Sequence, residues 1–103
     1  MVQKIVWSNE AKENIISIKN YISIDSEYYA YKLINLIYAS VQKLLQFPEI
    51  GMPVYQSEKY LVRRILIKNY RVLYILKEDI IYIIAVYHQL RQLPNTLDIP
   101  ESF

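Results

Sequence analysis

The second half of the chain carries three short runs rich in β-branched and aromatic residues, and their spacing restricts the fold more than any other feature. The runs are Leu61 to Ile67, Tyr70 to Leu76 and Ile80 to Tyr87. Residues of these types favour strands. Because only two or three residues separate one run from the next, each strand must turn back on the one before it. The sequence therefore predicts an antiparallel three-stranded meander.

The first half of the chain has helical spacing instead. Ser8 or Asn9 can cap a first helix, along which apolar residues recur at intervals of three and four as far as Ile22. Asp25 and Ser26 then supply a break and a second cap. A second apolar stripe follows, made of Ala30, Leu33, Ile37, Val41 and Leu44. Because the connection is short, the two helices are predicted to form a hairpin.

The remaining segments complete the predicted order of elements. Lys4 to Trp7 is a short β-prone opening, whereas Gly51 and Pro53 predict an irregular stretch before the meander. The tail from about residue 93 is also expected to be irregular. We therefore expect one α+β domain over residues 1–103, ordered β-α-α-β-β-β, with the helical hairpin packed on one face of an antiparallel sheet.

Composition excludes several classes of site. An apolar fraction of 53% is sufficient for a packed core. The absence of cysteine excludes disulfides, thiolate metal sites and a cysteine nucleophile. There is no glycine-rich phosphate loop, metal-ligand pattern or serine in a nucleophile context, so we expect no metal and no cofactor. The longest apolar run is too short to span a bilayer, and we expect a cytoplasmic protein without membrane contact.

Basic residues gather in the predicted meander although the net charge of the chain is only +2. All four arginines fall between positions 63 and 91, and no acidic residue occurs from Lys59 to Lys77. A basic surface of this kind can attract phosphates or an acidic protein partner. Alternatively, the charges protect a sheet edge from unwanted strand pairing. The candidate binding residues are Arg63, Arg64, Lys68, Arg71, Tyr87 and Arg91.

Alternation along the predicted strands sorts these arginines onto faces. Arg64 shares a face with Val62, and Arg63 takes the opposite face. Arg71 shares a face with Leu73. A buried charge without a partner is costly, so these faces are partly open or each arginine has a carboxylate or carbonyl partner.

His88, the only histidine, lies where the third run ends. Histidine suits general acid–base chemistry near neutral pH, and Arg91, three residues later, could stabilise a phosphate or a developing negative charge. A lone histidine at a strand end also commonly serves as a structural hydrogen-bonding residue. Most of the eleven tyrosines are expected to pack on helix and sheet faces.

Short motifs recur in a fixed order along nearly the whole chain. They are Trp7-Ser8 to Ala11, Tyr21-Ile22, Ala30, Leu44 to Gly51, Val62 to Ile65, Asn69 to Tyr74, and Val86 to Gln92 with Pro94 and Leu97. Their order and spacing resemble the RelE/ParE superfamily, the toxins of type II toxin–antitoxin (plasmid stabilisation) systems. The resemblance implies a β-α-α-β-β-β toxin neutralised by a cognate antitoxin, with which it can form a hetero-oligomer.

The resemblance implies one of three modes of action. ParE-like members inhibit DNA gyrase and are not nucleases, and the leucine-rich helix end followed by Phe47 to Gly51 is closer to them. RelE-like members cleave messenger RNA in the ribosome, using basic residues and a late tyrosine or histidine. A third interpretation is a non-toxic relative that only binds an antitoxin.

The nuclease residues of RelE-like members match this chain only in part. Arg64 falls where one strand lysine sits, but Val62 occupies the place of the other. Arg71 and Arg91 match the two family arginines, whereas Leu97 stands about where the late tyrosine would be. For a nuclease, the implied catalytic set is Arg64, Arg71, His88 and Arg91. The two departures favour gyrase as the target.

Overall fold

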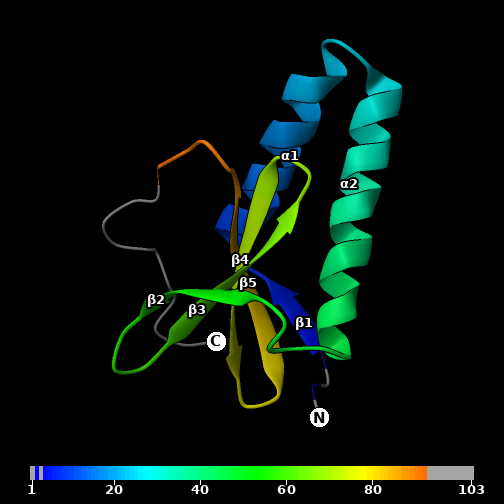
Figure 1. Cartoon of the computed structure of the whole chain (residues 1–103). Helices are drawn as coiled ribbons and strands as arrows, with labels where there is room; N and C mark the ends of the chain where they lie inside the picture. The colour runs from blue at the N-terminus through cyan, green and yellow to red at the C-terminus, as the bar shows by residue number, and fades with distance from the viewer. Residues whose placement is uncertain (1, 3, 93–103) are drawn as a thin grey trace.

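Five strands form one mixed sheet in the order β1-β5-β4-β3-β2 (Figure 1). The computed structural model describes residues 2 and 4–92, so the predicted irregular tail and its Leu97 lie outside the described residues. The strands are β1 (Lys4–Trp7), β2 (Met52–Gln56), β3 (Leu61–Ile67), β4 (Tyr70–Lys77) and β5 (Ile80–His88). The helices are α1 (Asn9–Ser23), α2 (Glu27–Gln42) and the short 3-10 helix η1 (Lys43–Leu45). The predicted α+β class is confirmed.

Serine side chains cap both long helices. Ser8 Oγ accepts a hydrogen bond from the backbone nitrogen of Ala11 at 3.0 Å and donates one to the carbonyl of Ile84 at 2.7 Å. Ser26 Oγ accepts a hydrogen bond from the backbone nitrogen of Tyr29 at 3.1 Å. Each cap satisfies a donor that the first helical turn leaves unpaired. The predicted hairpin is confirmed, and Figure 1 shows the two helices side by side.

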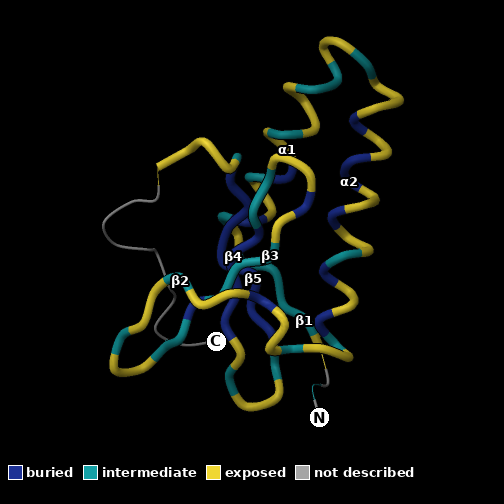
Figure 2. Tube along the Cα trace, in the orientation of Figure 1, coloured by how far each residue is buried: buried dark blue, intermediate teal, exposed yellow. Residues whose placement is uncertain are grey.

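The hairpin buries its apolar stripe against one face of the sheet. The core on this side consists of Ala11, Ile15, Leu33, Ile34, Ile37, Val41, Leu44, Ile67, Val72, Tyr74, Ile81, Ile83 and Val86. The buried stretches of α2 and of the central strands are visible in Figure 2. Removal of this apolar surface from water is the main favourable term in folding.

A second buried cluster lies on the opposite face of the sheet. It consists of Val62, Leu73, Ile75, Tyr82, Ile84, Ala85 and Tyr87. Val54 of β2 and Tyr60, which precedes β3, pack against this cluster. The central strands are therefore buried on both faces, which explains the almost continuous apolar sequence of β5.

One pairing differs from the predicted antiparallel sheet. β1 lies parallel to β5, with Lys4 opposite Ile80 and Trp7 opposite Ile83. Parallel neighbours need a long crossover, and here both helices and the other three strands separate β1 from β5 in the sequence. Periodicity indicates which face a residue occupies but not the direction of its neighbouring strand, so the prediction treated the whole sheet as antiparallel.

The prediction of an irregular stretch around Gly51 and Pro53 is wrong from Met52 onward. β2 forms there and pairs antiparallel with β3, with Pro53 opposite Arg63. Proline is tolerated because β2 is an edge strand, where a missing N–H need not interrupt the pairing. The register also shifts between Pro53 and Tyr55, which marks a bulge or a local irregularity.

Candidate functional site

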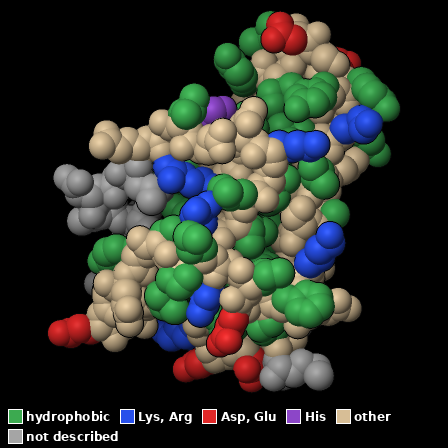
Figure 3. Space-filling model, in the orientation of Figure 1, with side chains coloured by type: hydrophobic (Ala, Val, Ile, Leu, Met, Phe, Trp, Pro, Cys, Tyr) green, Lys and Arg blue, Asp and Glu red, His purple; other side chains and the backbone are tan. Residues whose placement is uncertain are grey.

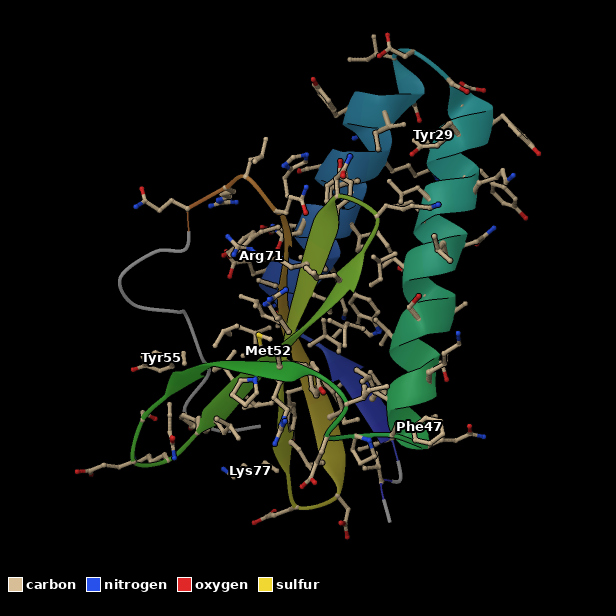
Figure 4. All side chains as sticks on the ribbon, viewed as in Figure 1. Tyr29, Phe47, Met52, Tyr55, Arg71 and Lys77 are labelled. Atoms are coloured by element: carbon tan, nitrogen blue, oxygen red, sulfur yellow. The ribbon has the colours of Figure 1, made fainter. Side chains whose placement is uncertain are left out.

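Two candidate arginines lie together on the sheet face opposite the helices. Arg64 of β3 lies opposite Leu73, and Arg71 of β4 lies opposite Leu66, so the two arginines are diagonal neighbours on adjacent strands. Arg64 shares its face with Val62 and Arg71 shares its face with Leu73, both members of the second cluster, which confirms the predicted faces. The Nη2 atom of Arg64 lies 3.3 Å from the sulfur of Met52, and Figure 4 labels Met52 and Arg71.

Arg71 is also linked to Tyr87 and Arg91 near the end of β5. Tyr87 lies directly opposite Arg71 in the pairing of β4 with β5. Nη2 of Arg71 donates a hydrogen bond to the carbonyl of Arg91, and the Arg91 guanidinium carbon lies 4.1 Å from the centroid of the Tyr87 ring. The Tyr87 hydroxyl donates a hydrogen bond to Glu10 Oε1 at 3.0 Å. We call Arg64, Arg71, Tyr87 and Arg91 the arginine cluster.

His88 faces the helix side of the sheet, away from Arg64 and Arg71. The pairing of β4 with β5 shifts at Ile84, which has no partner in the register. Because one extra residue reverses the alternation, Tyr87 joins the second cluster and His88 turns toward the helices. The His88 ring makes an edge contact with Tyr70 at 5.3 Å between centroids. Burial raises the pKa of the Tyr70 phenol.

The imidazole of His88 has a structural hydrogen bond. Its Nδ1 accepts the backbone N–H of Leu90 at 3.1 Å. A neutral imidazole with Nδ1 as acceptor carries its proton on Nε2, which is then a donor. His88 does share a shallow pocket of 360 Å³ with Tyr87 and Arg91. In this geometry Nε2 can donate a hydrogen bond there, whereas Nδ1 is already occupied by the Leu90 N–H.

Arg63 lies outside the arginine cluster. Its Nη1 donates hydrogen bonds to the carbonyls of Glu49 at 3.1 Å and Gly51 at 2.8 Å. These carbonyls belong to the loop between η1 and β2, so Arg63 fixes that loop from within the fold. Of the two alternatives left open by the sequence, a partly open face or a polar partner, Arg63 has carbonyl partners, and its guanidinium is used locally.

The same loop is held by Tyr74, which lies opposite Arg63 in the pairing of β3 with β4. The Tyr74 hydroxyl donates to the carbonyl of Pro48 and accepts from the nitrogen of Gly51. Burial raises the pKa of the Tyr74 phenol; the Gly51 hydrogen bond and the charge of Arg63 act in the opposite direction, and the charge of Glu49 acts in the same direction as burial.

Lys68 is also separate from the cluster, in the two-residue turn between β3 and β4, where its φ is 54°. It lines a groove of 570 Å³ along α2. The other lining residues are Tyr28, Tyr29, Tyr31, Lys32, Leu33, Asn35 and Leu36. Tyr28 and Tyr31 are 71% and 66% exposed. The sequence interpretation assigned most tyrosines to packing and missed this groove; the available signal was that Tyr28 and Tyr31 fall outside the buried stripe of α2.

The described residues were also compared with the requirements of a metal site and of a membrane-spanning helix. Within residues 2 and 4–92, no three histidine, cysteine, aspartate or glutamate side chains gather closely enough to hold a metal ion. Neither long helix in the described part of the chain has the length and apolar character required to cross a membrane.

Comparison with known proteins gives the family. The profile of the ParE toxin of type II toxin–antitoxin systems, parDE, matches residues 5–93. Among solved structures, the chain is similar to a chain of the chromosomal ParDE toxin–antitoxin system from P. aeruginosa, with a TM-score of 0.69 and 18% identity. That match covers 85% of this chain and 96% of the other, and it supports the fold. No curated protein matches the chain.

The matched segment contains both long helices, the arginine cluster and all of the sheet except Lys4. A profile match over so much of the sequence identifies the family independently of the structural likeness. The chain therefore belongs to the family of ParE toxins of type II toxin–antitoxin systems.

Proposed function

We propose that this toxin stops growth by binding and inhibiting DNA gyrase, without cleaving RNA. The observation that carries the proposal is the hydrogen bond from the Leu90 backbone to Nδ1 of His88. It supports a structural role for the residue that would otherwise be the best candidate for a general base. ParE family membership supports the same target, because ParE-like toxins are those associated with gyrase.

RNA cleavage by 2′-hydroxyl attack needs a base, an acid and stabilisation of charge at the phosphate. Arg64, Arg71 and Arg91 can supply the stabilisation. The Tyr87 hydroxyl already donates a hydrogen bond to Glu10, and a phenol is largely protonated at neutral pH. The cluster therefore suits recognition of an anionic surface better than proton abstraction.

The ParE family implies an antitoxin partner. We propose that the toxin acts in the cytoplasm, where gyrase works on DNA, and that it is held in a hetero-oligomer with its antitoxin until the antitoxin is removed. Free toxin would then be the inhibitory species, and its release would couple loss of the antitoxin to arrest of growth.

A supercoiling assay tests this function directly. Purified toxin, gyrase and relaxed plasmid are incubated together, and we expect supercoiling to be lost at micromolar toxin. The same preparation added to a translating ribosome extract should leave messenger RNA intact. Lys12→Gln removes one positive charge at an exposed position of α1. This control variant should inhibit as well as the parent. Unaffected supercoiling would remove gyrase as the target, and harmless overexpression would favour a non-toxic antitoxin-binding relative.

A ribosome-dependent endonuclease using Arg64, Arg71, His88 and Arg91 is the second candidate. It is favoured by the 3.0 Å contact between the Tyr87 hydroxyl and Glu10, because Glu10 could act as the base through Tyr87, accepting the phenolic proton as the phenolic oxygen takes one from the 2′-hydroxyl. Cleaved message in the extract, abolished by Glu10→Gln with folding intact, would establish this mechanism in place of gyrase inhibition.

A further inference from the structure

Arg71 carries a donor that the fold does not satisfy. Its Nε–H is buried and meets no hydrogen-bond acceptor within residues 2 and 4–92, although Nη2 of the same guanidinium donates to the carbonyl of Arg91. Buried polar groups in folded proteins nearly always have a partner, and an unpaired group that carries positive charge is especially costly. This unsatisfied N–H therefore indicates that an acceptor is supplied from elsewhere.

Arg64 on the neighbouring strand also lacks a strong acceptor in the described part of the chain, although its side-chain contact is exposed. Among the described residues, its Nη2 meets the sulfur of Met52, which is a weak acceptor. No carboxylate among the described residues pairs with Arg64 or Arg71. Two guanidinium groups on diagonal positions repel each other, and an anion placed between them would relieve the repulsion and supply the missing acceptor.

Exposed apolar side chains lie around this pair of arginines. Met52 lies opposite Arg64, and Leu66 lies opposite Arg71. Met52, Leu66 and Tyr55 are 59%, 55% and 44% exposed. In Figure 3, hydrophobic and basic side chains adjoin one another on the visible face, whereas acidic side chains gather at its upper and lower margins. The surface thus combines cationic donors with exposed apolar side chains.

We propose that Arg71 and Arg64 bind a carboxylate presented by an acidic and apolar peptide segment of a protein partner, with Arg71 Nε–H donating to that carboxylate. The apolar residues of the segment would cover Met52, Leu66 and Tyr55. The proposal deepens the assignment of the chain as a toxin with a protein partner, and it does not depend on gyrase being the target.

The same features argue against a nucleic-acid backbone as the ligand. Proteins that follow a phosphate backbone use extended basic surfaces, whereas here the cationic groups form a small cluster surrounded by exposed methionine, leucine and tyrosine. A net charge of +2 also provides little long-range attraction for nucleic acid. A peptide with alternating acidic and apolar residues complements both components of the surface.

The test follows the Arg71 Nε–H resonance by nuclear magnetic resonance in the full chain labelled with ¹⁵N. Three probes are compared: a short synthetic peptide in which Glu alternates with Leu, its twin with Gln in place of Glu, and a short single-stranded RNA. Loss of the peak in Arg71→Lys assigns the resonance. We expect the Glu peptide to move this peak and the Gln twin to leave it unchanged.

Affinity provides the second readout. Arg71→Gln should weaken binding of the Glu peptide roughly tenfold, the scale of one charge-assisted hydrogen bond, and Lys12→Gln should leave it unchanged. Arg64→Gln keeps the test valid if Arg71→Gln does not fold, because the Arg64 side chain donates only to the Met52 sulfur among the described residues, and it should also weaken binding.

Several outcomes would overturn the proposal. Equal binding of the Gln twin would show that the carboxylate is not the recognised group. Tighter binding of RNA that depends on Arg71 would identify nucleic acid, in place of a peptide, as the ligand. Absence of binding by the Glu peptide would reject the surface. A shift of the Arg71 peak in the free chain on Asp98→Asn or Glu101→Gln would place the acceptor within the chain. Gyrase inhibition is measured separately, so failure of either hypothesis is recognised independently.

Discussion

The phenolic oxygen of Tyr74 lies 2.9 Å from the backbone nitrogen of Gly51 and accepts its hydrogen bond. The same hydroxyl donates to the carbonyl of Pro48 at 2.9 Å, while Arg63 holds the carbonyl of Gly51 from the neighbouring strand. Two side chains of the sheet, Tyr74 and Arg63, thus fix the loop that leads into β2. They bind its backbone at Pro48 and Gly51.

Gly51→Ala is expected to destabilise the protein by about 1–3 kcal/mol through overpacking. A Cβ at this position would lie 2.6 Å from the Tyr74 hydroxyl and 2.8 Å from the carbonyl of Arg64, so side chain and backbone would both have to move. Urea unfolding of the two proteins measures the difference. Adding Gly51→Ala to a Tyr74→Phe background should cost somewhat less than in the parent, since the hydroxyl clash is absent although the ring carbon Cε1, 2.7 Å from the added Cβ, remains. Equal costs in both backgrounds would show that the Tyr74 hydroxyl does not contribute to the clash.

Tyr74→Phe should lower the free energy of unfolding by about 1–3 kcal/mol near neutral pH, because it leaves the Gly51 N–H without its acceptor. The effect depends on pH. The folded state raises the pKa of Tyr74, so the native protein favours the neutral phenol. This stability is fully present below the unfolded pKa of about 10 and is lost as the pH rises through the higher folded pKa. The difference between parent and variant should therefore shrink in alkali, as measured by urea unfolding across that range; a difference that grows there would contradict it.

The sequence predicted the elements with the strongest local signals. Ser8 and Ser26 cap the helices because a short polar side chain can accept the first free N–H, and this depends only on neighbours. The strand containing Pro53 was missed because its formation depends on an edge position, which no local pattern reveals. The parallel pairing of β1 likewise depends on where the chain returns after the whole meander.

The β4–β5 turn offers a stabilising substitution. Glu78 and Asp79 have φ values of 51° and 65°, a left-handed conformation that costs most side chains energy. Asn is tolerated better there, so Glu78→Asn should raise the free energy of unfolding by up to about 1 kcal/mol. Glu58→Asn, in the β2–β3 connection without a positive φ, is the matched control and should change little. Equal effects in thermal unfolding would point to charge instead of backbone conformation.

The candidate site was predictable only where alternation is regular. Arg64 and Arg71 share a face because β3 and β4 alternate without interruption around them. In β5 the shift at Ile84 exchanges the faces of Tyr87 and His88, so simple alternation would place the wrong one beside the arginines. The extra residue depends on how β5 pairs with β4. The uniformly apolar sequence of β5 gives no sign of where such a shift occurs.

His88→Ala tests the structural interpretation of this histidine. Because its Nδ1 only accepts the exposed N–H of Leu90, we expect a stability loss of about 0.5–1.5 kcal/mol and unchanged growth arrest on induction. A RelE-like nuclease that uses His88 would lose toxicity instead. Growth curves at matched protein levels, with thermal unfolding of each purified variant, separate loss of chemistry from loss of fold.

The two helix caps provide a matched pair of serines whose surroundings differ. Ser26 makes one exposed contact, to the nitrogen of Tyr29, so Ser26→Ala should cost about 1 kcal/mol, as for a typical cap. Ser8 accepts from Ala11 and also donates to the carbonyl of Ile84, so Ser8→Ala removes a cap together with a link between α1 and β5.

We therefore expect Ser8→Ala to cost about 1–3 kcal/mol, more than Ser26→Ala. Urea unfolding of both variants gives the comparison. Ser8→Thr, which retains a hydroxyl, should recover part of the loss and show that the hydrogen bonds are responsible. If the two alanine variants were equally stable, the Ser8–Ile84 contact would contribute nothing, and the placement of α1 against β5 would depend on apolar packing alone.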